Sequence, residues 1–347
     1  MGPRMIFGRT VCALLMVIWI VSIAAAQDKP IVLKLAHHVP VVHAVHRDIL
    51  EPWSRLVEKN TGGRVKIDIF HGGTLGGAPE QWDMAIQGRC DLSWGHQAHF
   101  PGRFPLTSVM ELPFLGFPSA EAASIVAWEL YQRTPEIRSE YPKVKMIFIH
   151  AGALFQLHMI KGKEIHKLED FKGKKVRAPG DVAVKILQSL GATPVGMPAP
   201  DTYLSLERGV IDGTLFAMDA VEGFKLAEVT RQQIVGNFYA PMFFLVMNLD
   251  SWGKLPPDIQ KKIEEVSGAF GAAFAGKGWD NAGSRGVDVA KKAGNEIYQV
   301  PQTELVRWEK STKPVYDAWL NEMQKKGLPG KKVLDELLVL SEKYRKK

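Results

Sequence analysis

The stretch IVLKLAHHVPVVHAVHRDILEPWSRLVEKNTGGRVKIDIF, residues 31–70, decides the fold class. Its first residues are strand-like, and the segment from His43 to Gly63 places apolar side chains at helical spacing before stopping at two glycines. Residues 64–70 then alternate apolar and polar side chains with period two. A strand, a helix and a strand in so short a span predict a β-α-β unit, and therefore an α/β protein.

The same alternation continues along the chain. A glycine loop at 72–77, two helical segments and a buried strand complete one α/β set, and a second set begins near residue 151. The apolar segment 239–252 has no neighbour in the second set, so we interpret it as the chain crossing back. We therefore expect two lobes with a ligand cleft between them and long C-terminal helices. The expected division is a signal peptide at 1–26, a first lobe at 27–150 with a return segment at about 238–265, a second lobe at 151–237 with C-terminal contributions at about 296–325, and a helical segment at 257–347 that bridges both lobes.

The first residues predict export. Arg4 and Arg9 precede the apolar run VCALLMVIWIVSIAAA, which ends in small residues and is shorter than the roughly 20 residues that span a bilayer. We expect cleavage before Gln27 and a soluble mature protein in the periplasm. Cys12 would leave with the signal peptide, so Cys90 has no disulfide partner and the core alone must stabilise the fold.

Several classes of function are disfavoured by the sequence. The net charge of +7 is modest and dispersed, which fits an anionic ligand but not nucleic acid. The loop GGTLGG at 72–77 matches neither nucleotide-binding fingerprint, and no G-x-S-x-G motif marks a catalytic serine. We expect no enzyme activity and no cofactor.

The histidines leave one alternative open. They form two closely spaced groups, His37, His38, His43 and His46, and then His96 and His99. Histidines three apart share a helix face and could bind zinc, as in an exported zinc-dependent enzyme or a metal-binding protein. No glutamate completes an H-E-x-x-H motif, however. We prefer a milder role, in which His37 or His38 contacts a ligand at the carboxyl end of the first strand.

An exported two-lobed α/β protein has the general design of a periplasmic binding protein. The segments LKLAHHVP, MAIQGRCDLSW, LEDFKGKKVRAPGD, YLSLERGVIDG and LPPDIQKKIEE follow in an order that resembles the solute-binding proteins of tripartite ATP-independent periplasmic (TRAP) transporters, the DctP-type family. The resemblance covers nearly the whole chain after the signal peptide. It implies a binding protein that delivers a small organic anion to membrane permease subunits, and we expect a monomer. A sensor with the same fold and a signalling partner is a second alternative.

The resemblance also implies a role for one arginine. In the family the arginine of the K-x-R-x-P segment holds the ligand carboxylate in a two-pronged salt bridge, and that position is Arg177 here. A planar guanidinium matches a carboxylate with paired donors, whereas lysine offers a point charge. Lys172, Lys174 and Lys175 are expected to be surface charges.

Departures from the family's pattern favour an apolar ligand body. The strand that opens the second lobe carries Phe155 and offers only Gln156 as a polar group, so a second cation is missing. After Asp212-Gly213 many members read Gln-Glu-Asn, whereas this chain has Thr, Leu and Phe216. Unpaired ligand hydroxyls in such a site would cost about 1–3 kcal/mol each. We therefore expect a monocarboxylate with an aromatic or branched apolar body.

Other candidates complete the expected site. Trp94 would form a wall of the cleft, Tyr239 and Phe243 could do so near the crossing strand, and Asp219 is a charge that could reach the cleft. The remaining candidate hydrogen-bond donors are His37, His38, Gln97 and Gln156.

Overall fold

The computed structural model describes residues 29–345. The expected signal peptide at 1–26 lies outside the described residues. None of the helices between residues 29 and 345 combines the length and the apolar character that crossing a bilayer needs.

The first lobe is built on a five-stranded sheet in the order β2-β1-β3-β10-β4. Strands β1, β2, β3 and β4 run in one direction, and β10 runs antiparallel between β3 and β4. Nearly every residue of β4 and all of β10 are buried, which explains why their sequences are continuous apolar runs. The strands are β1 (Ile31–Ala36), β2 (Val65–Phe70), β3 (Leu92–His96), β4 (Val144–Ala151) and β10 (Met242–Asn248). The apolar segment that we interpreted as a return is therefore a strand of the first sheet.

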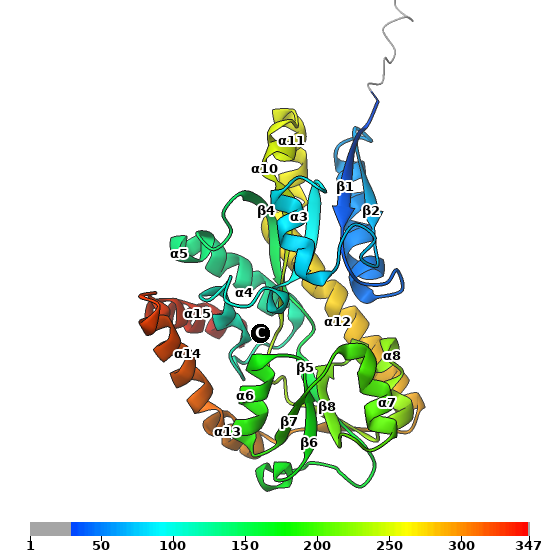
Figure 1. Cartoon of the computed structure of the whole chain (residues 1–347), viewed down its shortest axis with the longest axis vertical. Coiled ribbons are helices and arrows are strands. Elements are labelled where there is room, and N and C mark those ends of the chain that lie inside the picture. The colour runs from blue at the N-terminus through cyan, green and yellow to red at the C-terminus, as the bar shows by residue number, and fades with distance from the viewer. Residues whose placement is uncertain (1–28, 346–347) are drawn as a thin grey trace, which may run out of the picture.

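The second lobe is built on a six-stranded sheet in the order β11-β9-β5-β8-β6-β7. Strand β5 pairs antiparallel with β8 and β9, while β6 pairs parallel with β7 and β8. The strands are β5 (Phe155–Met159), β6 (Lys175–Ala178), β7 (Thr193–Gly196), β8 (Gly213–Ala217), β9 (Gln232–Val235) and β11 (Glu296–Gln299). In Figure 1 this sheet lies below the first one, with the helices of the second lobe beside it.

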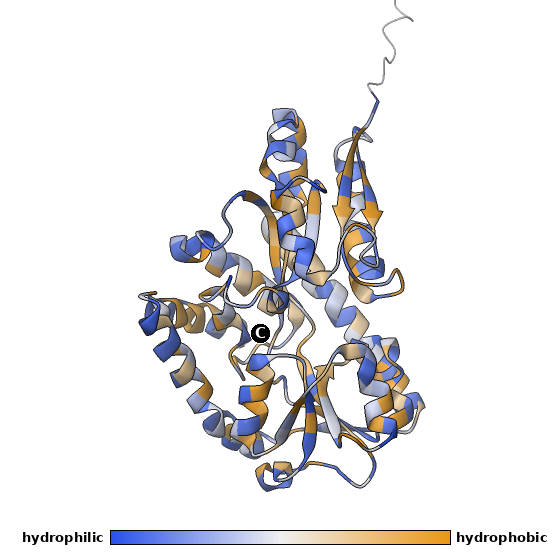
Figure 2. Ribbon diagram, in the orientation of Figure 1, coloured by the Kyte–Doolittle hydropathy of each residue, from blue (hydrophilic) through white to orange (hydrophobic). Residues whose placement is uncertain are grey.

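Helices cover both sheets. In Figure 2 the strands of the first sheet are mostly hydrophobic, whereas the strands of the second sheet and the helices carry both hydrophobic and hydrophilic residues. The helices of the first lobe are α2 (Glu51–Asn60), α3 (Gln81–Ile86), α4 (Ala120–Arg133), α5 (Pro135–Arg138), α10 (Leu249–Gly253) and α11 (Pro257–Glu265), with the short turns η1 (Val45–Leu50), η3 (Gln97–His99) and η4 (Thr107–Glu111). Those of the second lobe are α6 (Asp181–Leu190), α7 (Thr202–Glu207), α8 (Asp219–Gly223) and α9 (Leu226–Val229).

The C-terminal helices tie the lobes together. They are α12 (Gly268–Lys292), α13 (Gln302–Ser311), α14 (Lys313–Lys325) and α15 (Gly330–Arg345). Helix α12 contacts α4, β4 and η1 in the first lobe and α8 and β11 in the second, and Figure 1 shows it running between them. Helix α14 contacts α6 and α15, and α15 in turn contacts α4.

The chain also crosses between the lobes in two neighbouring segments. One follows β4 and the other precedes β10, and they hydrogen-bond to each other. The backbone N–H of Gly152 donates to the carbonyl of Pro241 at 2.7 Å, and that of Phe155 donates to Tyr239 at 2.9 Å. The carboxyl ends of several strands therefore meet beside this double crossing, where open α/β sheets place their ligands.

Candidate functional site

A cavity of about 780 Å³ lies between the two lobes beside the double crossing. The first lobe contributes residues from the ends of β1 and β3, and the second contributes the ends of β6 and β8. Helix α12 adds Trp279. The arrangement fits a small ligand held by groups from both lobes.

Arg177 is the cationic side chain of this cavity. It lies on β6 between two neighbouring strands and is 3% exposed. Its Nε donates to the carbonyl of Met197 at 3.2 Å and its Nη1 to that of Leu215 at 3.4 Å, while no carboxylate within residues 29–345 forms an ion pair with it. Burial lowers its pKa to about 10, so the guanidinium remains charged at neutral pH. A buried charge is unfavourable without a partner, and three of its five N–H donors remain available to an anion.

Aromatic rings of the second lobe surround this guanidinium. The Phe216 ring lies 4.6 Å from Arg177 Cζ, a cation–π contact. Phe155 stacks on Phe216 with ring centroids 5.9 Å apart, and it contacts Tyr239 at 4.7 Å. The side of the cavity that holds the charge is therefore otherwise apolar.

The first lobe supplies a second aromatic wall. The Trp94 ring stacks on Phe243, with centroids 4.9 Å apart and planes at 13°. Trp279 stacks on Phe243 at 5.6 Å. The Trp94 indole N–H donates to Nε2 of His150 at 3.0 Å, while Nδ1 of His150 bonds to the Ala151 carbonyl at 2.9 Å. These bonds fix the orientation of the Trp94 ring.

Polar groups without hydrogen-bond partners also line the cavity. They are His38, His96, His99 and Asp219, each with a buried ring nitrogen or carboxylate oxygen that no described group satisfies. Burial lowers the pKa of His38 to about 4 and raises that of Asp219 to about 6. At pH 7 the histidine is neutral and the aspartate is mostly ionised.

Seven of the eleven expected site residues line this cavity: Arg177, Phe216, Trp94, His38, Phe155, Phe243 and Asp219. Three of the others form hydrogen bonds within the protein. His37 is fully buried, and its Nε2 lies 3.0 Å from Nδ1 of His46. Gln97 donates to the Tyr141 hydroxyl at 2.8 Å. Gln156 bonds the backbone N–H groups of Gly236 and Asn237, both at 2.9 Å, and so holds the crossing segment.

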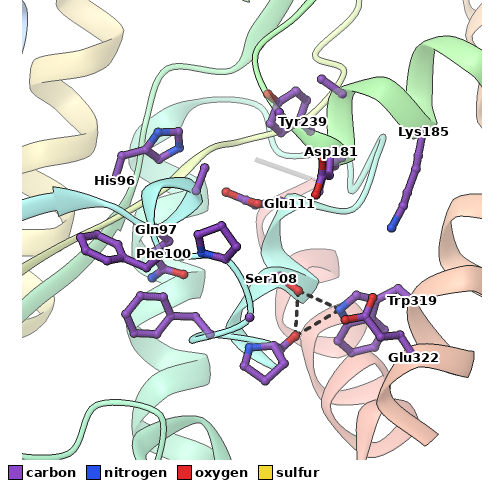
Figure 3. Close-up of a pocket in the computed structure, with 18 of the residues that line it drawn as sticks. His96, Gln97, Phe100, Ser108, Glu111, Asp181, Lys185, Tyr239, Trp319 and Glu322 are labelled. Carbon is purple, nitrogen blue, oxygen red and sulfur yellow. Dashed lines mark hydrogen bonds between the residues drawn. The ribbon is translucent and has the colours of Figure 1, made fainter. Parts of the chain in front are cut away.

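The last, Tyr239, lines a smaller adjoining cavity of about 320 Å³, which Gln97 lines as well and which Figure 3 shows. The two cavities share His96 and residues 179–181. The Glu111 carboxylate points into the smaller one, and burial raises its pKa to about 7. The Trp319 indole N–H donates to Ser108 Oγ at 2.9 Å at the edge of this cavity.

The lining residues that were not among the expected site residues include His96, His99 and Trp279. The two histidines were visible as a closely spaced pair, but their spacing suggested zinc. Trp279 lies far along the chain on α12, and no local pattern marks its direction. Only the contact of α12 with both lobes brings it to the cavity.

The zinc alternative finds no geometric support. Residues 29–345 contain no group of three His, Cys, Asp or Glu side chains placed to hold a metal ion. The side chains of His43 and His46 have different neighbours. The His43 ring contacts Trp279, while the His46 ring contacts His37 and His71.

Comparison with known proteins agrees with this arrangement. The model of the family "Bacterial extracellular solute-binding protein, family 7" matches residues 35–323. A TRAP solute-binding protein of Rhodoferax ferrireducens T118, solved with copurified benzoate, is 31% identical, with a TM-score of 0.83 over 91% of this chain and 99% of that one.

Two further structures are similar. A marine metagenome TRAP solute-binding protein specific for aromatic acid ligands, in complex with metahydroxyphenylacetate, is 30% identical, with a TM-score of 0.83 over 90% of this chain and 99% of that one. A Bordetella bronchiseptica TRAP periplasmic solute-binding protein with bound (R)- and (S)-mandelate is 28% identical, with a TM-score of 0.79 over 90% and 99%. The two-lobed α/β fold and the resemblance noted in the sequence are thereby confirmed.

Proposed function

The chain belongs to the bacterial extracellular solute-binding proteins of family 7 and is a TRAP solute-binding protein, and we propose that it captures an aromatic monocarboxylate. TRAP solute-binding proteins act in the periplasm, bind small organic acids and work with membrane permease components. In our proposal this protein reaches the periplasm through its N-terminal signal peptide and delivers its ligand to such a permease.

The observation that carries the proposal is the unpaired charge of Arg177. A buried guanidinium without an anionic neighbour is stabilised when a carboxylate binds, because the ligand supplies the missing charge in a water-poor site. Among residues 29–345, those that line the cavity include no lysine and no second arginine. Asp181 and Asp219 line it as well, and they would repel a second carboxylate. These features favour a monocarboxylate over a dicarboxylate.

The aromatic walls of the cavity indicate what kind of ligand body fits between them. Trp94 and Phe243 form one aromatic surface and Phe155 and Phe216 another, on opposite lobes. An aromatic ring gains from stacking on such surfaces in addition to the area it buries. The related proteins solved with benzoate, metahydroxyphenylacetate and mandelate also hold aromatic acids.

Thermal unfolding tests this proposal. Protein purified from the periplasm is melted with benzoate, benzamide, succinate and glucuronate. Benzoate at 100 times its dissociation constant should stabilise the protein by about 2.7 kcal/mol. Benzamide has the same ring without the charge and should give little shift. Succinate and glucuronate should bind weakly, because they lack an aromatic body.

Two variants assign the carboxylate site. Arg177→Met should abolish the benzoate shift, and Arg177→Lys should weaken binding at least tenfold, because a point charge cannot replace the planar pair of donors. Arg55→Met is the control, since Arg55 is exposed and outside the cavity. An equal shift with benzamide, or full benzoate binding by a folded Arg177→Met protein, would contradict the proposal.

A further inference from the structure

The cavity holds a group of three histidines, His38, His96 and His99, on the wall formed by the first lobe. The His99 ring lies edge-on to both others, with centroids 5.0 Å from His38 and 5.1 Å from His96. His38 stacks on Trp94 and His96 stacks on Phe243. The three rings therefore form one polar edge of an aromatic wall, on the opposite lobe from Arg177.

These rings have no hydrogen-bond partners among residues 29–345. The buried atoms left unsatisfied are Nδ1 of His38, Nε2 of His96 and Nδ1 of His99. Burial lowers the pKa of each ring, so all three are neutral at pH 7. A neutral imidazole has one donor nitrogen and one acceptor nitrogen.

Two other buried histidines show what a structural role looks like in this protein. His150 bonds to Trp94 through one nitrogen and to the Ala151 carbonyl through the other. His158 bonds through its two nitrogens to Gln233 and to the Phe216 carbonyl. Both rings are satisfied by the protein itself. The three cavity histidines differ from them, because buried polar groups are normally paired and these are not.

We propose that the three-histidine group receives a hydroxyl of the ligand, so that the ligand is a hydroxylated aromatic monocarboxylate. This inference rests on the proposed function, in which Arg177 holds the carboxylate and the two aromatic walls hold the ring. A hydroxyl both donates and accepts, which matches neutral imidazoles. A second carboxylate only accepts, and the described residues that line the cavity place no cation beside these rings to balance its charge.

Calorimetric titration of protein purified from the periplasm tests this step. The probes are benzoate, its 2-, 3- and 4-hydroxy derivatives, the corresponding methoxy derivatives, and isophthalate and terephthalate. One hydroxybenzoate should bind about tenfold more tightly than benzoate, the ratio expected for one net hydrogen bond. Its methyl ether should lose this gain, because it cannot donate.

Variants then assign the gain to the histidines. His96→Phe and His99→Phe should lower the affinity for the preferred hydroxybenzoate about tenfold more than they lower the affinity for benzoate. His96→Gln retains hydrogen-bonding groups and should keep part of the preference. His166→Phe is the control, since His166 is exposed on the second lobe and outside the cavity. Retained benzoate binding shows that each variant is folded.

The outcomes separate the two proposals. If benzoate binds in an Arg177-dependent way while no hydroxybenzoate binds more tightly, the histidine inference is overturned and the proposed function stands. Tightest binding of isophthalate or terephthalate would also overturn it. If no aromatic acid binds, both proposals fail together.

Discussion

At the scale of single residues, the cavity contains two charged groups that burial affects in opposite directions. Desolvation lowers the pKa of Arg177 and raises that of Asp219 to about 6. The Asp219 carboxylate has one oxygen without a hydrogen-bond partner, and its charged neighbours are Arg285, which lowers the pKa, and Glu222, which raises it. Asp219 therefore costs stability whenever it is ionised.

If ionised Asp219 destabilises the fold, the difference in unfolding free energy between Asp219→Asn and the wild type should depend on pH. The folded protein keeps a proton that the unfolded chain releases between about pH 4 and pH 6, so the wild type gains stability at low pH and loses it as the pH rises through 6. The Asn variant lacks this titration. Its stability relative to the wild type should rise by about 1–3 kcal/mol between pH 4 and pH 7, as measured by urea unfolding.

The exposed Asp317 on α14 provides the matched control, Asp317→Asn, for loss of a surface carboxylate. Parallel stability curves for wild type and Asp219→Asn across this range would show that burial does not perturb the carboxyl group.

At the scale of elements, α12 depends on its glycines. A Cβ at Gly271 would lie 2.4 Å from the Phe148 ring, and one at Gly276 would lie 2.5 Å from the backbone of Glu121. These glycines therefore let the long helix pack closely against the first lobe. At its other end, a Cβ at Gly286 would lie 1.8 Å from the carbonyl oxygen of Met218. The helix therefore packs tightly against both lobes.

Replacing Gly286 or Gly283 on α12 by alanine should change the unfolding free energy in opposite directions. Gly286→Ala must push α12 away from the backbone before α8, and we expect it to lower the unfolding free energy by about 1–3 kcal/mol. Gly283→Ala meets only the Met218 Cβ at 3.8 Å, an ordinary contact. It should stabilise the protein by about 0.5–1 kcal/mol, because alanine favours the helix. Urea unfolding of the two variants measures this difference. Equal unfolding midpoints would refute close packing at Gly286.

At the scale of the whole molecule, an ion network joins the lobes next to the cavity. Arg47 and Asp48 belong to η1 of the first lobe, Glu222 to α8 of the second, and Arg285 to α12. Arg285 pairs with both Asp48 and Glu222, and Arg47 lies 3.9 Å from Glu222. The network therefore favours the lobe arrangement that encloses the cavity.

Removing the charge of Glu222 should weaken ligand binding without touching the ligand. Exposed ion pairs contribute about 0.2–1 kcal/mol, so Glu222→Gln should lower benzoate affinity by about two- to fivefold at low salt. The difference should shrink at high ionic strength, because salt screens exposed charges. Titrations at two salt concentrations measure it. Glu264→Gln, which breaks a pair with Lys145 within the first lobe, should leave affinity unchanged. Equal affinities of wild type and Glu222→Gln at low salt would rule out the coupling.

The sequence by itself determined the elements and the two-lobed α/β class, because periodicity depends on neighbours along the chain, and its resemblance to the TRAP solute-binding proteins indicated Arg177 as the candidate cation. The choice between adjacent residues needed the tertiary structure. His38 and Phe155 line the cavity, while their neighbours His37 and Gln156 bond within the protein. Successive side chains of a strand point to opposite faces. A side chain that faces the cavity therefore has neighbours along the chain that face the protein interior.

The partners of the polar groups were also decided only by the tertiary structure. His96, His99 and Trp279 reach the cavity because β3 and α12 lie next to segments that are distant in sequence. Whether a histidine is satisfied, like His150, or unpaired, like His96, depends on those distant contacts. Local sequence patterns do not predict these contacts, because packing between the lobes depends on the whole chain.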